Sequence, residues 1–227
     1  MTTLTTSPVA AVLDRLFAQA AVTSPQDSLY VAKLGDDELD RLLRSKTEYL
    51  DFYSELKHLP LAVSRDTGAL LYMLATSIKA RNVIEFGTSL GVSTLYLAAA
   101  LRDNGGGRLI TTEFEASKVT RARANLFEAG LADLVEVREG DALLTLAGDL
   151  PQAIDLLLLD GAKAIYPEVL KRVESRLRPG ALIVADDAAY SQEFLDYVRS
   201  SANGYLSVPL ADGVELSDLA PVSRTPL

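Results

Sequence analysis

One stretch, residues 81–102, constrains the fold of this chain more than any other. It begins with a short run at 83–86 that is apolar except for one acid and stops at Gly87. Beyond Gly91, apolar residues recur at intervals of three and four up to residue 100, which is the spacing of a helix. The stretch therefore predicts a buried strand, a turn with glycine at both ends, and a helix.

This turn has the features of a ligand site. Gly87 and Gly91 allow positive φ angles and let a ligand approach without a Cβ in the way. Ser93 and Thr94 place hydroxyls beside the free backbone N–H groups of the first helical turn, which suits a carboxylate or a phosphate.

The spacing of the turn excludes two nucleotide motifs. The dinucleotide fingerprint needs a glycine where this chain has Ser89, and the P-loop needs a lysine after Gly91. What remains is an acid followed by two glycines, Glu85-x-Gly87-x-x-x-Gly91. This pattern resembles motif I of the class I S-adenosylmethionine-dependent methyltransferases.

Strands and helices alternate after residue 81, which predicts a Rossmann-like, doubly wound, mostly parallel α/β sheet with helices on both faces. The last two strands, at 205–210 and 214–219, have no helix between them and form an antiparallel hairpin, with Pro209 indicating an edge. The expected strands before the hairpin are 83–86, 108–112, 134–138, 154–159 and 181–185.

The 227 residues suit one structural domain, divided into an N-terminal helical extension at 1–80 and a cofactor-binding methyltransferase part at 81–227. In the extension we expect helices at 9–20, from 36 or 37 to about 56, and at 66–79. Because these helices precede the first strand, they are expected to form a cap, an oligomer surface, or both.

The composition limits the kinds of partner and site that this chain can have. With 22 basic and 31 acidic residues the net charge is −9, which disfavours nucleic acid as a partner. The absence of cysteine excludes disulfides and thiolate sites. No apolar run approaches about 18 residues and the N-terminus lacks a leader pattern, so we expect a soluble, cytoplasmic protein without a membrane partner.

Acids follow the predicted strands, where open parallel sheets bind their ligands. Glu113 can accept both hydroxyls of a ribose, or serve as a charge at a helix N-terminus. Asp141 can accept from an adenine amino group, cap the helix that follows, or do both.

Asp160 follows the predicted strand at 154–159, and the adjacent Asp186 and Asp187 follow the predicted strand at 181–185. Carboxylates that meet at one rim repel each other, and a hard divalent cation such as Mg²⁺ would relieve the repulsion. Lys163 can act as a general base if neighbouring cations depress its pKa. In the alternative interpretation the two adjacent acids cap a helix near residue 190 and Lys163 pairs with Glu168.

The combination of D-x-x-K, A-D-D, motif I and a second-strand glutamate resembles the cation-dependent O-methyltransferases related to catechol and caffeoyl-CoA O-methyltransferase, over residues 60–219. The resemblance implies a homodimer, a small-molecule acceptor and S-adenosylmethionine as cofactor. It implies metal ligation by Asp160, Asp186 and Asp187, catalysis by Lys163 with Asp160, substrate contact by Glu215, and a cofactor site that contains Glu85, Gly87, Gly91, Ser93, Glu113, Asp141 and Asp160.

Three departures from the family pattern concern the metal site and the acceptor. Asp187 stands where the family has asparagine, which adds a negative charge, and Gly161 and Ala162 replace the His-Trp of the catechol enzymes. The chain has no tryptophan, so the aromatic wall that grips a catechol is missing.

We therefore predict an S-adenosylmethionine-dependent O-methyltransferase that acts on a hydroxyl of a small catechol-like or other vicinal-oxygen acceptor, assisted by a divalent cation. Three alternatives remain: a metal-independent small-molecule methyltransferase, a cofactor-binding module without catalysis, and a nicotinamide dehydrogenase. Ser89 in the place of the second glycine argues against the last.

Overall fold

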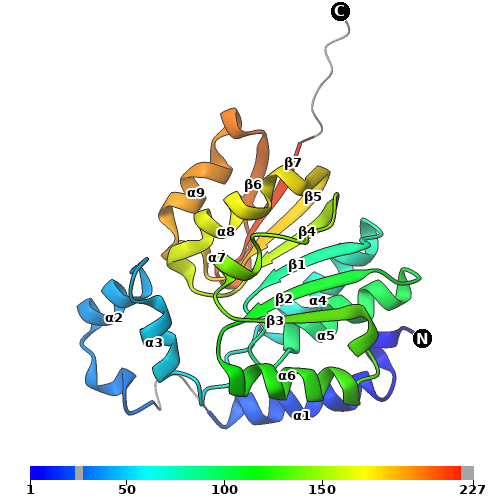
Figure 1. The fold of residues 1–227 in the computed structure, drawn as a ribbon, viewed down its shortest axis with the longest axis horizontal. Helices are drawn as coiled ribbons and strands as arrows, with labels where there is room; N and C mark the ends of the chain where they lie inside the picture. The colour runs from blue at the N-terminus through cyan, green and yellow to red at the C-terminus, as the bar shows by residue number, and fades with distance from the viewer. Residues whose placement is uncertain (24–27, 221–227) are drawn as a thin grey trace, which may run out of the picture.

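The computed structural model describes residues 1–23 and 28–220. A seven-stranded sheet in the order β3-β2-β1-β4-β5-β7-β6 forms its centre (Figure 1). The first five strands are parallel and the last two pair antiparallel, so the predicted mostly parallel sheet with a C-terminal hairpin is confirmed. The strands are β1 (Asn82–Phe86), β2 (Arg108–Glu113), β3 (Val135–Glu139), β4 (Ile154–Leu159), β5 (Leu177–Ala185), β6 (Tyr205–Pro209) and β7 (Glu215–Leu219).

The strand order reverses at β1. From β1 the chain runs outward to β2 and β3 and then returns to β4 on the other side of β1. The loops that leave β1 and β4 therefore diverge to opposite faces, and a crevice opens at the carboxyl ends of these two strands.

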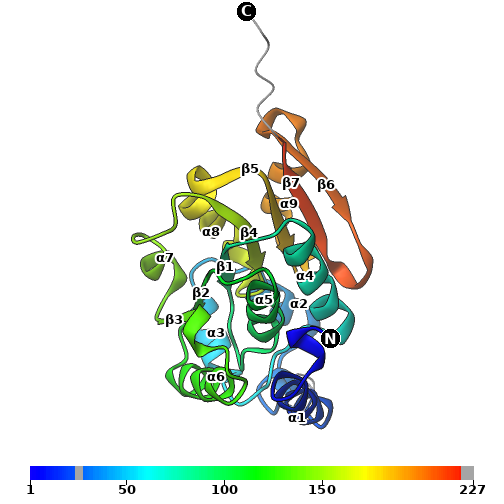
Figure 2. The same ribbon diagram turned by 90° about the vertical axis from the view of Figure 1, so that its right-hand side faces the viewer.

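Helices cover both faces of the sheet (Figures 1 and 2). One face carries α1 (Val9–Ala21), α4 (Arg65–Ser77), α5 (Val92–Asp103) and α6 (Ala116–Glu128), and the other carries α7 (Ala142–Thr145), α8 (Tyr166–Val173) and α9 (Gln192–Arg199). Alternate side chains of β4 point to opposite faces of the sheet. Leu156 and Leu158 pack against the first set of helices, and Leu157 and Leu159 pack against the second set. This two-sided burial explains why β4 reads as a continuous apolar run.

Two short helices, α2 (Asp36–Leu43) and α3 (Tyr49–Glu55), lie to one side of the sheet in Figure 1. The prediction of one long helix from 36 to 56 is wrong. The hydroxyl of Ser45 accepts from the N–H of Glu48 and donates to its carboxylate, and this local pairing favours a turn over a continued helix. The two helices share a small apolar cluster of their own around Phe52.

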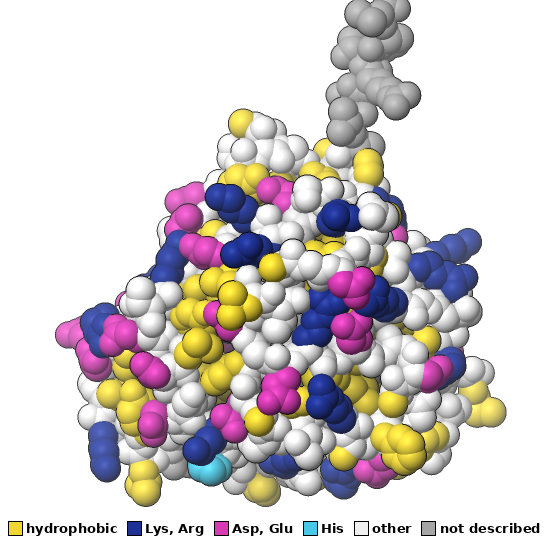
Figure 3. All heavy atoms as spheres, viewed as in Figure 1, with side chains coloured by type: hydrophobic (Ala, Val, Ile, Leu, Met, Phe, Trp, Pro, Cys, Tyr) yellow, Lys and Arg dark blue, Asp and Glu magenta, His cyan; other side chains and the backbone are white. Residues whose placement is uncertain are grey.

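Contacts between this helix pair and the rest of the chain are polar as well as apolar. Lys46, between α2 and α3, donates hydrogen bonds to Glu168 of α8 at 2.7 Å and to Glu193 of α9 at 2.5 Å. Figure 3 shows apolar side chains gathered between the pair and α7. In the described part of the chain no helix is both long and apolar enough to cross a membrane.

Candidate active site

A cavity of about 620 Å³ lies at the carboxyl ends of β1, β2, β4 and β5, and α2, α3 and the segment before α4 close its other side. Many of the predicted site residues line it together: Gly87, Glu113, Asp141, Asp160, Lys163, Asp186 and Asp187. Four predicted residues do not line it: Glu85, Gly91, Ser93 and Glu215.

The turn after β1 brings its backbone against the end of β4. Gly87 has a φ of +105°, and a Cβ there would lie 2.6 Å from the carbonyl carbon and oxygen of Asp160. Gly91, with a φ of +87°, begins α5 in the left-handed region. Both positions therefore need glycine for backbone geometry, and at Gly87 the missing side chain also keeps the cavity floor open.

Glu113 is held in a fixed orientation at the end of β2. One carboxylate oxygen accepts from the N–H of Ser89 and the other from the N–H of Glu115, each at 2.9 Å. Burial raises the pKa of Glu113, although these backbone bonds and nearby Lys118 oppose the shift. Each oxygen keeps a free lone pair for a further donor, so the carboxylate can receive a pair of hydroxyls.

Glu85 lies beneath the turn rather than in the cavity. Its two oxygens accept from the hydroxyls of Ser93 and Thr94, each at 2.6 Å, and the side chain is fully buried. Burial raises its pKa to about 7, against the effect of these hydrogen bonds. Glu85 and Ser93 therefore join the turn to the first turn of α5, and any effect they have on a ligand passes through the shape of that turn.

Asp141 combines two interactions at the edge of the cavity. One oxygen caps α7 by accepting from the N–H of Leu143 at 2.9 Å, and the other accepts from the hydroxyl of Tyr49 on α3 at 2.9 Å. Burial first, and then the bond to Asp141, raise the pKa of Tyr49, so its hydroxyl remains a donor. The capping function expected for Asp141 is present, and the carboxylate still lines the cavity.

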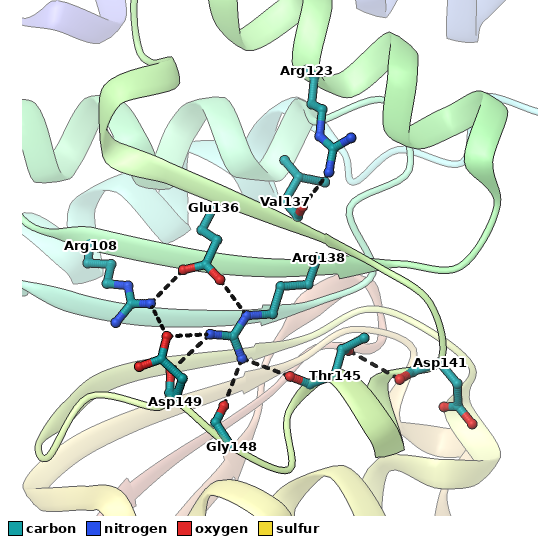
Figure 4. Close-up of polar contacts among 9 residues, drawn as sticks. All are labelled: Arg108, Arg123, Glu136, Val137, Arg138, Asp141, Thr145, Gly148 and Asp149. Carbon is teal, nitrogen blue, oxygen red and sulfur yellow. Dashed lines mark hydrogen bonds and ion pairs between the residues drawn. The ribbon is translucent and has the colours of Figure 1, made fainter.

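Arg138 on β3 holds the loop that follows Asp141 (Figure 4). Its guanidinium donates to the carbonyls of Thr145 at 2.7 Å, Gly148 at 3.0 Å and Asp149 at 2.9 Å. The hydroxyl of Thr145 in turn donates to the carbonyl of Asp141 at 3.1 Å. The Arg138 side chain is only 12% exposed, and its three bonds fix the path of the loop.

The acids after β4 and β5 gather around Lys163. Its ammonium lies 2.9 Å from Asp160, 3.7 Å from Asp186 and 4.0 Å from Asp187. Burial lowers the pKa of Lys163, but the negative potential of Asp160 and Asp186 outweighs it, so the net pKa is raised. Burial, followed by repulsion from Asp160, raises the pKa of Asp186. As it stands, Lys163 holds its proton, which is the opposite of the shift that a general base needs.

The chemistry of these acids fits a hard cation. Within residues 1–23 and 28–220, no group of three or more acidic, histidine or cysteine side chains is arranged to hold a metal ion as it stands. The ammonium of Lys163 contacts all three carboxylates instead. Their oxygens are nevertheless the ligands that Mg²⁺ prefers, and three carboxylates face the single positive charge of Lys163.

Glu215 belongs to a different contact. On β7 it accepts two hydrogen bonds from Arg199 of α9, at 2.7 and 2.9 Å, and one from Ser207 at 2.6 Å. The turn before it comes closer to the cluster, because a Cβ on Gly213 would lie 3.3 Å from a carboxylate oxygen of Asp187. The structure therefore places the hairpin turn, and not Glu215, beside the acids.

The sequence predicted a cap from the N-terminal helices but did not identify the residues of the wall that faces the acids. This wall comes from the 3₁₀ turn at Val31–Lys33, from α2 and α3, and from the segment before α4, and its members are Val31, Leu39, Leu43, Tyr49, Leu50, Phe52, Tyr53, Leu56, Leu59 and Leu61. The tyrosines four residues apart on α3 were the available signal, since that spacing places them on one helical face.

Known proteins share this fold and site region. Residues 84–188 match a family model described as a methyltransferase domain. A catechol O-methyltransferase of Niastella koreensis is 36% identical over 143 residues, 60% of this chain and 62% of that protein, so the chain matches less than two thirds of its length. A Mycobacterium sp. (strain JLS) protein named as an O-methyltransferase is 32% identical over 174 residues, 67% of this chain and 77% of that protein. The crystal structure of the O-methyltransferase TomG from Streptomyces achromogenes, in complex with SAM, has a TM-score of 0.63 and 27% identity, and the match covers 88% of this chain and 100% of that chain.

Proposed function

The chain belongs to the class I O-methyltransferases of the catechol and caffeoyl-CoA type, and from this premise we propose that it transfers the methyl group of S-adenosylmethionine to a hydroxyl oxygen of a small acceptor. One observation carries the proposal: a single cavity joins the fixed carboxylate of Glu113 to the cluster around Lys163. A methyl donor and an acceptor bound at these two places would meet within it.

Cofactor binding would use the carboxyl ends of β1, β2 and β3. Gly87 leaves room for the cofactor against the strand ends, Glu113 accepts the ribose hydroxyls, and Asp141 accepts from the adenine amino group. A cofactor bound in this way would present its sulfonium methyl to the acidic cluster, because Asp160 of that cluster adjoins the turn at Gly87.

Acceptor activation is assigned to the acidic cluster. Asp160, Asp186 and Asp187 would hold a divalent cation, which when bound lowers the pKa of an acceptor hydroxyl and orients it. Lys163 lies within reach of the same position, and positive charge held by these carboxylates would offset the negative potential that raises its pKa, so that it could accept the hydroxyl proton. Orientation then contributes most to the rate, because the sulfonium leaving group is already activated.

The acceptor would present two neighbouring oxygens to the cluster and an apolar body to α2 and α3. Leucines and the tyrosines of α3 form this wall, and no tryptophan is present in the chain. Such a wall accommodates aliphatic as well as aromatic groups. A homodimer is part of the proposal on family grounds, and light scattering of the purified protein tests it.

A specific observation favours a second candidate, a methyltransferase that needs no metal. Lys163 already neutralises part of the cluster by direct contact with each carboxylate. In that case the carboxylates and the lysine orient the acceptor themselves.

The test is calorimetric titration of S-adenosylhomocysteine, repeated after EDTA treatment and again with Mg²⁺ and a catechol, followed by transfer of labelled methyl from S-adenosylmethionine. Cofactor binding with Mg²⁺-dependent catechol binding and turnover supports the first proposal. Turnover that EDTA leaves unchanged supports the second, and a protein that binds no cofactor contradicts both.

A further inference from the structure

Lys118 is a buried cation that faces the cavity. It lies in the first turn of α6, its residue is only 5% exposed, and it lines the cavity together with Glu113. Arg121 and Arg123 on the same helix are exposed to solvent, whereas the side chain of Lys118 turns inward toward the end of β2.

The ammonium of Lys118 makes no hydrogen bond and no ion pair with any described residue. Burial lowers its pKa, and the negative potentials of Glu113 and Glu115 only partly offset this effect. Because this buried side chain lines the cavity, its ammonium is a ready donor to whatever fills the cavity.

Glu113 and Lys118 offer a ligand one hydrogen-bond acceptor and one hydrogen-bond donor side by side. Glu113 can only accept when ionised, and the backbone N–H groups of Ser89 and Glu115 fix its orientation. Lys118 can only donate. The two do not form a direct ion pair, although each shifts the pKa of the other, so a small polar group can lie between them.

We propose that Lys118 is a cofactor-binding residue that donates a hydrogen bond to a ribose hydroxyl oxygen while Glu113 accepts the hydroxyl protons. This inference rests on the proposed function, since it assumes that a nucleoside diol lies at Glu113. A hydroxyl is both donor and acceptor, and only a pair of this kind satisfies both capacities.

The charge balance favours a neutral diol over an anion. A phosphate or carboxylate that reached Lys118 would also approach Glu113, and repulsion in this buried setting would cancel the gain. A hydroxyl gains from both side chains at no such cost.

The test compares two ligands on two proteins. S-adenosylhomocysteine and its 2′,3′-dideoxy analogue are titrated calorimetrically into the wild type and into Lys118→Met. Loss of one charged hydrogen bond should weaken S-adenosylhomocysteine binding about 10- to 100-fold, and the variant should bind the dideoxy analogue as the wild type does. Equal losses for both ligands, or no loss for either, would overturn the assignment.

A second variant separates donation from charge. Lys118→Gln keeps an N–H donor without the positive charge and should recover a large part of the lost affinity. If it binds as weakly as Lys118→Met, Lys118 acts only by stabilising the Glu113 carboxylate, and the proposed contact is wrong. Arg121→Met, an exposed change three residues further along the helix, should leave both affinities unchanged.

Folding does not obscure the result. Replacing a desolvated ammonium by the apolar methionine side chain of similar length should preserve or raise the melting temperature. A wild type that fails to bind S-adenosylhomocysteine contradicts the proposed function itself. A wild type that binds it and shows no dependence on Lys118 contradicts only this inference.

Discussion

The hydroxyl of Tyr49 on α3 donates a 2.9 Å hydrogen bond to Asp141, 92 residues later in the chain, where the carboxylate caps α7. A helix of the N-terminal extension is thereby attached to a cavity residue that follows β3. The wall of the cavity and its edge at Asp141 are therefore directly connected.

Tyr49→Phe should lower the free energy of unfolding by about 1–2 kcal/mol, because a carboxylate loses a donor at a partly buried position. Urea denaturation monitored by circular dichroism measures the change. Tyr190→Phe is the matched control, since the Tyr190 hydroxyl makes no hydrogen bond to a described residue while its ring also lines the cavity. Equal effects of the two changes would contradict a specific role for the Tyr49 bond.

The stability of the protein should depend on Glu85 between about pH 4.5 and pH 7. Burial raises the pKa of Glu85 to about 7, so the folded state binds a proton that the unfolded state has already lost. The stabilisation is complete below pH 4.5 and disappears as the pH rises through 7, by up to about 3 kcal/mol. Urea denaturation of the wild type and of Glu85→Gln across this pH range measures how the free energy of unfolding depends on pH. The variant should lose the slope, and an unchanged slope would assign it to another group.

Gly87→Ala should destabilise the protein by about 3 kcal/mol or more and weaken S-adenosylhomocysteine binding. The added Cβ would meet the Asp160 backbone at 2.6 Å while φ is +105°, so strain and overlap act together. Gly130→Ala serves as the control because its φ is +68° but nothing lies within 4 Å of the new Cβ. It should cost only about 1 kcal/mol of backbone strain. Similar losses of stability in the two variants would mean that backbone strain alone explains the effect of Gly87→Ala.

Arg138→Met should release the loop after Asp141. The change removes the donors to three loop carbonyls, which should cost about 2–4 kcal/mol of stability and several-fold in cofactor affinity. Arg138→Lys should recover part of the stability only, because a single ammonium cannot reach all three acceptors. Denaturation and calorimetric titration on the same samples provide the comparison. Unchanged cofactor affinity in a destabilised variant would show that the network does not act on Asp141.

Mg²⁺ should raise the melting temperature of the wild type, and EDTA should reverse the shift, since a ligand that binds only the folded state stabilises it. Asp186→Asn should abolish the response, because it removes one negatively charged oxygen ligand from the cluster around Lys163. Asp141→Asn, at the other side of the cavity, should keep it. A shift of equal size in both variants would indicate that the ion binds elsewhere.

Much of the fold followed from local pattern. The glycine turn after β1, the buried run of β4 and the acids after each strand were visible because strand and helix periods are properties of short segments. Parallel pairing then requires that the acids after β2, β4 and β5 share one edge, and this is why Glu113, Asp160 and Asp186 line one cavity.

The sequence by itself therefore determined the sheet, its hairpin and the edge at which a ligand can bind, while the tertiary structure decided which side chains reach that ligand. Glu85 and Glu215 look equivalent to the other acids in sequence, but Ser93 with Thr94, and Arg199 with Ser207, occupy their oxygens away from the cavity. Lys118 lies within a charged helix, yet packing buries it beside Glu113. The reason is physical: whether a charge faces solvent, a partner or a cavity depends on groups brought close by the fold, and their distance along the chain conceals them from any local pattern.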